Sequence, residues 1–315
     1  MKTEIKDIEN RHISVLLEEL VNSIDINNDK KNIIVDMTLG MGGHASKIIE
    51  KMNTGDIFIG FDADIKNLDL AKIRLNEINK KKKIEIILVN SNFVNLKKEL
   101  KKLKIDKITG IYYDLGLSSL HLDEADRGFS FMLDGPLDMR LDKSKGKTAA
   151  DIVNGYTTDE LRKIFLKYGE EPGANKISAK IVEARKIKKL KTTKELSDVI
   201  GGIPKTKSRI FQAIRIEVNQ ELGNLEISLS DAINMLDKGG KLFVISFHSL
   251  EDRITKTILK NETRDCICDD LICSCKHTKT LKVLTKKPIL PTDKEIKANP
   301  RSRSAKARCA EKINK

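Results

Sequence analysis

The feature that most constrains the fold is an alternation of short apolar runs with helical segments through the first 120 residues. Strands that alternate with helices in this way indicate a parallel, doubly wound α/β sheet. Several of the runs end in an acidic residue, at the position where open sheets of this kind bind ligands. The apolar runs are Asn32–Asp36, Asp56–Asp62, Ile84–Val89 and Ile108–Asp114, and helices are expected over Ala45–Met52 and Asn67–Asn79.

The alternation stops after Asp114, and no convincing strand is found in the sequence from Ser119 to Asn219. Capping boxes that begin at Thr157 and Thr192 predict helix starts in this stretch. A third helix is expected around Ile177, where an apolar stripe lies beside a cluster of lysines and arginines. This stretch is therefore predicted to be a helical insertion.

The α/β pattern resumes with a helix over Glu221–Leu236, a turn at Lys238–Gly240 and a strand over Lys241–Phe247. A helix and strand after the insertion indicate one sheet interrupted by a second domain. We therefore predict a Rossmann-like domain built from residues 1–118 and 220–315, with residues 119–219 as an inserted substrate-recognition domain.

Charge and composition narrow the class of partner. Lys and Arg number 59 against 46 Asp and Glu, a net charge of +13, which favours a polyanion such as nucleic acid. A genome-wide bias towards Lys, Ile and Asn is the alternative explanation. No apolar run approaches the roughly 20 residues that span a bilayer. The charged segment Met1–Asn10 does not have the pattern of a secretion signal, so no membrane association and a cytoplasmic location are expected.

A glycine cluster over Asp36–His44 follows the first predicted strand. Glycines let a ligand approach the backbone closely, although the same cluster is compatible with a simple tight turn. The cluster matches neither the dinucleotide-binding fingerprint nor a phosphate-binding P-loop. Asp62 ends the second strand, where a carboxylate can accept both ribose hydroxyls of a nucleoside. Together, the loop and Asp62 favour an adenosine-containing ligand.

The third and fourth strands supply two further candidates. The ring of Phe93 can cover an adenine face, and ordinary core packing is the alternative. Asp114 ends the fourth strand at the ligand-binding edge, and its alternative role, like that of Ser118, is to cap a helix.

Four of the five cysteines lie within ten residues of one another. Thiolate ligation of zinc is one interpretation, with His277 nearby, but the C-x-C spacing is tighter than that of common zinc motifs. The alternative is a reduced, partly exposed loop, and no metal is assigned. The cysteines are Cys266, Cys268, Cys273, Cys275 and Cys309.

Six segments, in order along nearly the whole chain, carry a resemblance to a known family. The sequence resembles the RsmH (MraW) family of 16S rRNA cytosine-N4 methyltransferases, and the segment Arg127–Arg140 is the most specific match. The matching segments are His12–Glu18, Gly42–His44, Arg127–Arg140, Arg209–Asn219, Ser246–Arg253 and Asn299–Lys306.

The resemblance implies a class I methyltransferase fold, S-adenosylmethionine as methyl donor and a decoding-centre cytidine of the small ribosomal subunit as acceptor. His121 departs from the family pattern, in which glutamine is typical, so its contact is the least secure. The resemblance also implies that the cysteine cluster is not needed for the reaction. The implied cofactor contacts are Gly42, Gly43, His44, Asp62, Phe93, Asp114 and His121.

The N4 amine is a poor nucleophile because its lone pair is delocalised into the cytosine ring, so a group must accept an N–H hydrogen bond and orient it. Asp114 is the candidate catalytic residue, and cofactor binding alone is its alternative role. Basic residues in the family motifs are candidates for contact with phosphate or bases, against surface ion pairs as the alternative. These candidates are Arg127, Arg140, Arg215, His248, Arg253, Arg301 and Arg303.

Two rival functions remain open from the sequence. A nicotinamide-dependent dehydrogenase is disfavoured by the missing dinucleotide fingerprint. A non-enzymatic rRNA assembly factor fits the charge and the insertion. However, a cofactor pocket that had lost its function would not require Asp62 and Asp114. The sequence does not settle the oligomeric state, and a homodimer stays possible.

Overall fold

The computed structural model describes residues 13–268 and 274–314, and the chain divides into two compact units. One unit contains Met1–Gly116 and Gly223–Lys315, and the other contains Leu117–Leu222. The sequence predicts these divisions at residues 118/119 and 219/220. No helix in the described parts of the chain is long and apolar enough to cross a membrane.

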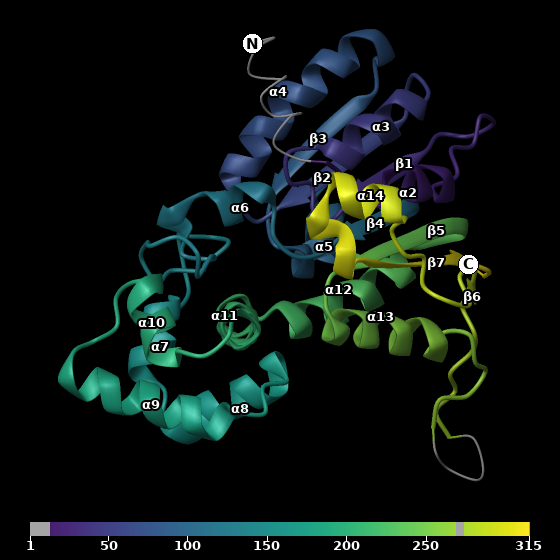
Figure 1. The fold of residues 1–315 in the computed structure, drawn as a ribbon. Coiled ribbons are helices and arrows are strands. Elements are labelled where there is room, and N and C mark those ends of the chain that lie inside the picture. The colour runs from purple at the N-terminus through teal and green to yellow at the C-terminus, as the bar shows by residue number, and fades with distance from the viewer. Residues whose placement is uncertain (1–12, 269–273, 315) are drawn as a thin grey trace. The chain divides into compact units, whose positions relative to one another are not determined.

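The first unit is built on a seven-stranded sheet with the order β3-β2-β1-β4-β5-β7-β6. Neighbouring strands from β3 to β5 are parallel, whereas β7 runs antiparallel to both β5 and β6 (Figure 1). This order confirms the predicted Rossmann-like α/β class. The strands are β1 Ile33–Asp36, β2 Ile57–Asp62, β3 Glu85–Asn90, β4 Ile108–Asp114, β5 Leu236–Ser246, β6 Leu281–Val283 and β7 Lys306–Lys312.

Alternating side chains of the strands supply two cores, because successive residues of a strand point to opposite faces. Tyr112 belongs to one cluster with Phe58, and Tyr113 belongs to the other with Ile59. Helices of this unit pack against both clusters, which buries the sheet on its two faces. The helices are α2 Leu17–Ser23, α3 Gly43–Lys51, α4 Ile65–Lys82, α5 Leu96–Lys102, α12 Glu221–Met235, α13 Ser249–Asn261 and α14 Asp293–Ala298, with 3-10 turns η1 Phe93–Asn95 and η3 Pro300–Ser304.

The start of β5 differs from the sequence prediction. Leu236 already pairs with Ile108, and the next pair joins Lys241 to Gly110, so the residues between them form an irregularity. Gly239 lies within it at φ 83°. The predicted turn is thus part of the longer strand β5 rather than a separate element before it.

The second unit is helical, and its described residues make one isolated bridge, between Pro136 and Thr192, and no named strand. Both predicted capping boxes are confirmed: the Thr157 and Thr192 hydroxyls each accept an N–H bond three residues on. The helices are α6 Ser119–Asp123, α7 Ala149–Gly155, α8 Thr158–Gly169, α9 Ala174–Ile187, α10 Thr193–Ile200 and α11 Pro204–Asn219, with the 3-10 turn η2 Ala125–Arg127.

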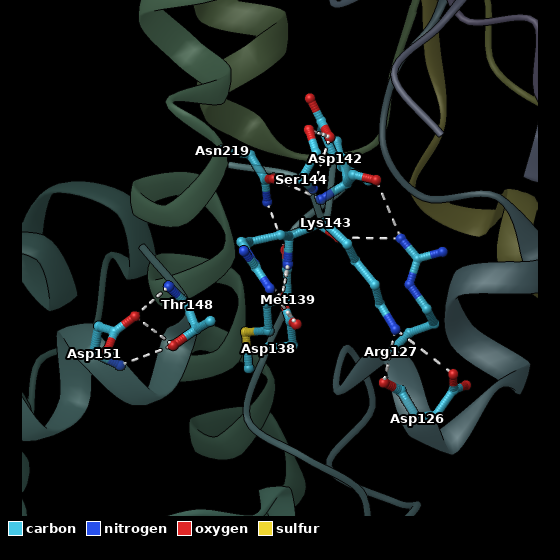
Figure 2. A network of polar contacts seen from close by, with 12 residues as sticks. Asp126, Arg127, Asp138, Met139, Asp142, Lys143, Ser144, Thr148, Asp151 and Asn219 are labelled. Atoms are coloured by element: carbon cyan, nitrogen blue, oxygen red, sulfur yellow. Dashed lines mark hydrogen bonds and ion pairs between the residues drawn. The ribbon is translucent and has the colours of Figure 1, made fainter. Parts of the chain in front are cut away.

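The segment between η2 and α7 has little regular structure, and polar contacts hold it (Figure 2). Met139 has a φ of 59°, an uncommon conformation for a residue with a side chain. Its N–H donates to the Arg127 carbonyl at 3.1 Å, and its carbonyl accepts from Asn219 Nδ2 at 2.8 Å. A Cβ on Gly135 would lie 1.8 Å from the Ala125 carbonyl oxygen, so this position requires glycine.

Candidate functional site

The loop between β1 and α3 is held by Asp62 at the end of β2. The Asp62 carboxylate accepts the Gly40 N–H at 2.8 Å and the Asp64 N–H at 2.8 Å. Asn67 Nδ2 makes two longer contacts of 3.3 Å with the same carboxylate. Gly42 is the N-cap of α3, with a φ of 76°, and no side chain caps the helix there. Asp62 therefore fixes the glycine loop whose backbone N–H groups begin α3.

Asp36, at the end of β1, is a residue that the sequence analysis did not assign to the site. It is 1% exposed and accepts the Thr38 N–H at 3.0 Å. Burial raises the pKa of Asp36 to about 8, so the carboxyl is protonated at neutral pH. The signal in the sequence was the acid that ends the first apolar run and begins the glycine cluster.

Asp114 ends β4 beside β1, and His44 on α3 lies against it. Asp114 Oδ2 is 3.5 Å from His44 Nδ1, and the Asp114 N–H donates to Thr38 Oγ1 at 2.6 Å. Burial, followed by the charge of Glu251, raises the pKa of Asp114 to about 7. At neutral pH the side chain is thus divided between its two protonation states.

His44 contacts Val15 through its other ring nitrogen, Nε2, which lies 2.8 Å from the Val15 carbonyl oxygen. Since a carbonyl only accepts, Nε2 carries a hydrogen, and burial lowers the pKa of His44 to about 4. The neutral ring therefore presents a lone pair at Nδ1, which can accept a hydrogen bond from protonated Asp114. His44 can therefore orient the protonated form of Asp114.

The second oxygen of Asp114, Oδ1, is buried and has no hydrogen-bond partner among the described residues. A buried acceptor without a partner is costly in a native structure, and such an atom calls for a donor from outside the chain. The glycine loop and the beginning of α3 are adjacent along the chain to His44. These residues fit a ligand that brings both an N–H donor and an anionic group for the helix N-terminus.

Phe93 lies on η1, after β3, and is half-buried. Its ring meets the Tyr113 ring edge-on, with 6.2 Å between centroids. The Ser228 hydroxyl donates to the Phe93 carbonyl at 3.0 Å. Phe93 thus packs on the sheet core without being fully buried.

His121 lies in the helical unit, on the short helix α6. Its Nδ1 accepts the Ser118 N–H at 3.3 Å and lies 3.2 Å from Ser118 Oγ. The ring is 3% exposed and packs 5.2 Å from the ring of Phe129, centroid to centroid. His121 therefore stabilises the beginning of α6 within its own unit.

The three arginines expected to bind RNA in the helical unit all have protein partners. Arg127 is 2% exposed, and its Nη2 donates to the carbonyls of Arg140 and Leu141. Arg140 forms a two-pronged ion pair with Asp138. Arg127 accordingly holds the loop of Figure 2 together and does not offer its guanidinium to an external phosphate in this structure. Arg215 forms an equivalent two-pronged pair with Glu221.

The remaining basic candidates belong to the sheet unit. Arg253, Arg301 and Arg303 have exposed side chains, as expected of residues that meet a polyanion. His248 begins α13, where its Nδ1 accepts the Glu251 N–H at 3.4 Å and its Nε2 lies 3.1 Å from Glu251 Oε1. The His248 side chain is 11% exposed, and its contacts with Glu251 cap the beginning of α13.

Comparisons with known proteins agree with the resemblance found in the sequence. The profile of the MraW methylase family matches residues 9–313. Ribosomal RNA small subunit methyltransferase H of Clostridioides difficile is 48% identical over 97% of this chain and 100% of its own length. The protein of the same name from Caldicellulosiruptor saccharolyticus is 47% identical over 96% and 99%. Among solved structures, an rRNA methylase from Streptococcus thermophilus aligns at 10% identity and a TM-score of 0.44, over 95% of this chain and 94% of that chain.

Family membership follows from the near-complete match of the profile and from relatives far above 30% identity across almost their whole length. The strand order of the sheet is consistent with it. The chain belongs to the MraW methylase family.

Proposed function

We propose that this methyltransferase acts on the N4 amine of a decoding-centre cytidine in the 16S rRNA of the small ribosomal subunit. The observation that carries the proposal is Asp114 Oδ1, a buried acceptor without a described partner at the ligand-binding edge of the sheet. An exocyclic amine brings the N–H that such an oxygen accepts. The relatives named ribosomal RNA small subunit methyltransferase H support this substrate class. A ribosomal substrate also supports the expected cytoplasmic location.

The methyl donor is S-adenosylmethionine, which supplies an electrophilic methyl group on a sulfonium. The N-terminus of α3, which begins at Gly43 after Gly42, suits the carboxylate of its methionine portion. Asp62 is suited to the ribose hydroxyls, which would replace the two long contacts from Asn67. The Phe93 ring is suited to contact the adenine face. His44 and Asp114 complete the side of the site next to β4.

Asp114 has two tasks in the proposed reaction. Its carboxylate first accepts an N–H bond from the amine at Oδ1, which localises the nitrogen lone pair and aligns it for attack. Formation of the N–C bond would break the bond between the methyl group and the donor's sulfur, which would leave as a neutral thioether. Asp114 would then take the proton that the positively charged nitrogen releases. A pKa of about 7 suits a general base that works near neutral pH. Once Asp114 is protonated, the lone pair of His44 Nδ1 can accept a hydrogen bond from Oδ2, which lies 3.5 Å away.

The helical unit is proposed to recognise the RNA substrate. Lys176 and Lys180 on α9 and Lys189, two residues beyond its end, expose their side chains. Lys186 is also exposed, but it is paired with Glu183. Phosphate contacts supply most of the affinity of such complexes and make it dependent on salt. Arg185 differs, because its Nη1 donates to the Val153 carbonyl at 2.7 Å. The RNA-binding face is therefore assigned to the exposed lysines and not to Arg185.

The test supplies purified protein with S-adenosylmethionine and small ribosomal subunits, and reads the modified nucleoside by mass spectrometry. We expect N4-methylcytidine at one position. Charge reversal at Lys176, Lys180 and Lys189 should weaken subunit binding and flatten its salt dependence without changing cofactor affinity. If the protein bound subunits but produced no methylated cytidine, the proposed enzymatic function would fail and a role as an assembly factor would replace it. A methyl group on another atom would retain the enzyme and overturn the N4 assignment.

A further inference from the structure

The loop between α13 and β6 carries a cluster of sulfur atoms that the methylation reaction does not use. Figure 1 shows this loop projecting from the sheet unit after α13. Its base is closed at Glu262, whose carbonyl accepts the N–H groups of Thr280 and Leu281 at 2.8 and 3.0 Å. The Lys279 N–H also donates to Asp265 Oδ1 at 3.3 Å. The segment between these contacts is thus tied at its ends and contains the cysteines.

Three of these cysteines converge in the described part of the loop. Cys266, Cys268 and Cys275 place their sulfur atoms within 4.8 Å of one another. The Cys266 and Cys268 sulfurs are 3.2 Å apart, and the Cys275 and Cys266 sulfurs are 3.8 Å apart. Residues on both sides of the loop therefore direct their sulfurs to one point. Cys273 lies outside the described residues.

These spacings suit a tetrahedral metal ion. With Zn–S bonds of about 2.3 Å, two sulfur ligands of a tetrahedron are about 3.8 Å apart. The Cys275–Cys266 spacing already has this value, and the Cys266–Cys268 pair must open by about half an ångström to reach it. The three side chains are half-buried, so an ion can enter from solvent.

The type of ligand atom narrows the choice of metal. Thiolate sulfur is a soft ligand that selects zinc over magnesium or calcium. Three convergent thiol groups in one loop have no comparable role in packing, because none of them is buried.

From this geometry we propose that Cys266, Cys268 and Cys275 bind one Zn²⁺ ion, which fixes the loop between α13 and β6. The ion takes its fourth ligand from outside these three residues. The site has a structural role, since it ties one end of the loop to the other. It stands independently of the proposed methylation of cytidine.

The test measures zinc in the full-length protein, purified under reducing conditions after growth with added zinc. Gel filtration against a weak chelator followed by elemental analysis should give one zinc per chain. The double variant Cys266→Ser and Cys268→Ser should lose the zinc. Cys309→Ala is the matched control, because Cys309 is buried in β7 and burial raises the pKa of its thiol to about 11. This variant should keep the metal.

Replacement of zinc by Co²⁺ gives a second readout that does not depend on activity. Tetrahedral cobalt bound by thiolates has intense sulfur-to-metal charge-transfer absorption, whose strength rises with the number of thiolates. We expect this absorption in the wild type and in Cys309→Ala, and its loss in the double variant with unchanged helix content by circular dichroism. Wild-type protein that holds no metal at excess zinc, or a Cys266–Cys268 disulfide in the mass spectrum, would overturn the proposal.

Discussion

The protonation of Asp114 should control the rate of methyl transfer between pH 6 and pH 8. Burial and the charge of Glu251 raise its pKa to about 7. The carboxylate is the form that accepts both the amine N–H and the released proton. An acid with a raised pKa is ionised above that value, so the rate should rise with pH through 7 and then level off. The dependence of kcat/KM on pH reports this pKa in the free enzyme.

The size of the effect follows from the ionised fraction. With a pKa of about 7, roughly one half of Asp114 is ionised at pH 7 and about one eleventh at pH 6, so kcat/KM should fall about fivefold over that unit. An aspartate with the ordinary pKa of 3.8 would stay ionised throughout and give a flat profile. The assay is transfer of a labelled methyl group to small ribosomal subunits at low substrate concentration.

Asp114→Asn removes the titrating group while retaining its shape. We expect a loss of about 10²-fold or more in kcat/KM, the scale of a general base, together with a flat pH profile. Asp69→Asn is the matched control, because Asp69 is exposed on α4 in the same unit. It should keep the wild-type rate and profile. Retention of the sloping profile in Asp114→Asn would refute the assignment of this slope to Asp114.

Three further predictions concern single side chains. Asp62→Ala should weaken S-adenosylmethionine binding by about 1–3 kcal/mol, and calorimetry showing unchanged affinity in folded protein would remove Asp62 from the site. Asp36 is held protonated in the folded state up to a pKa of about 8, whereas its ordinary pKa is 3.8. Wild-type stability should therefore fall relative to Asp36→Asn by about 4 kcal/mol between pH 5 and pH 8 in urea unfolding, and a constant difference would contradict its burial as an acid. Asn219→Ala removes the bonds to Met139 and Leu141 and should cost about 1–3 kcal/mol; an unchanged melting temperature would show that the loop does not depend on them.

The strands and the glycine loop were predictable from the sequence because their signals are local. Apolar runs that end in an acid marked β1, β2 and β4 within a few residues, and the capping boxes of α8 and α10 marked the helix starts. The start of β5 was missed because Gly239 reads locally as a turn. Its place in the strand depends on the pairing of Leu236 with Ile108, which lies far away in the sequence.

The roles of individual basic side chains were not predictable in the same way. Arg127 belongs to the most specific motif of the family, which suggested a contact with RNA. Its burial depends on the carbonyls of Arg140 and Leu141, and on a loop that Asn219 holds from the far end of the helical unit. A sequence motif shows that an arginine is required at this position. Whether its guanidinium contacts RNA or the protein's own carbonyl groups depends on the packing of the folded chain.

The charge of the site also arises only when the strands are assembled. Asp36, Asp62 and Asp114 end three strands that are neighbours in the sheet, in the order β2-β1-β4. Burial is the largest cause of the raised pKa of Asp36, and the charges of Asp114 and Asp62 raise it further. With Asp36 protonated, Asp62 and the ionised fraction of Asp114 still place negative charge at this edge, which favours a positively charged ligand. S-adenosylmethionine carries a sulfonium charge that its demethylated product lacks. The ionised carboxyl groups at this edge of the sheet therefore favour binding of the donor over retention of the product.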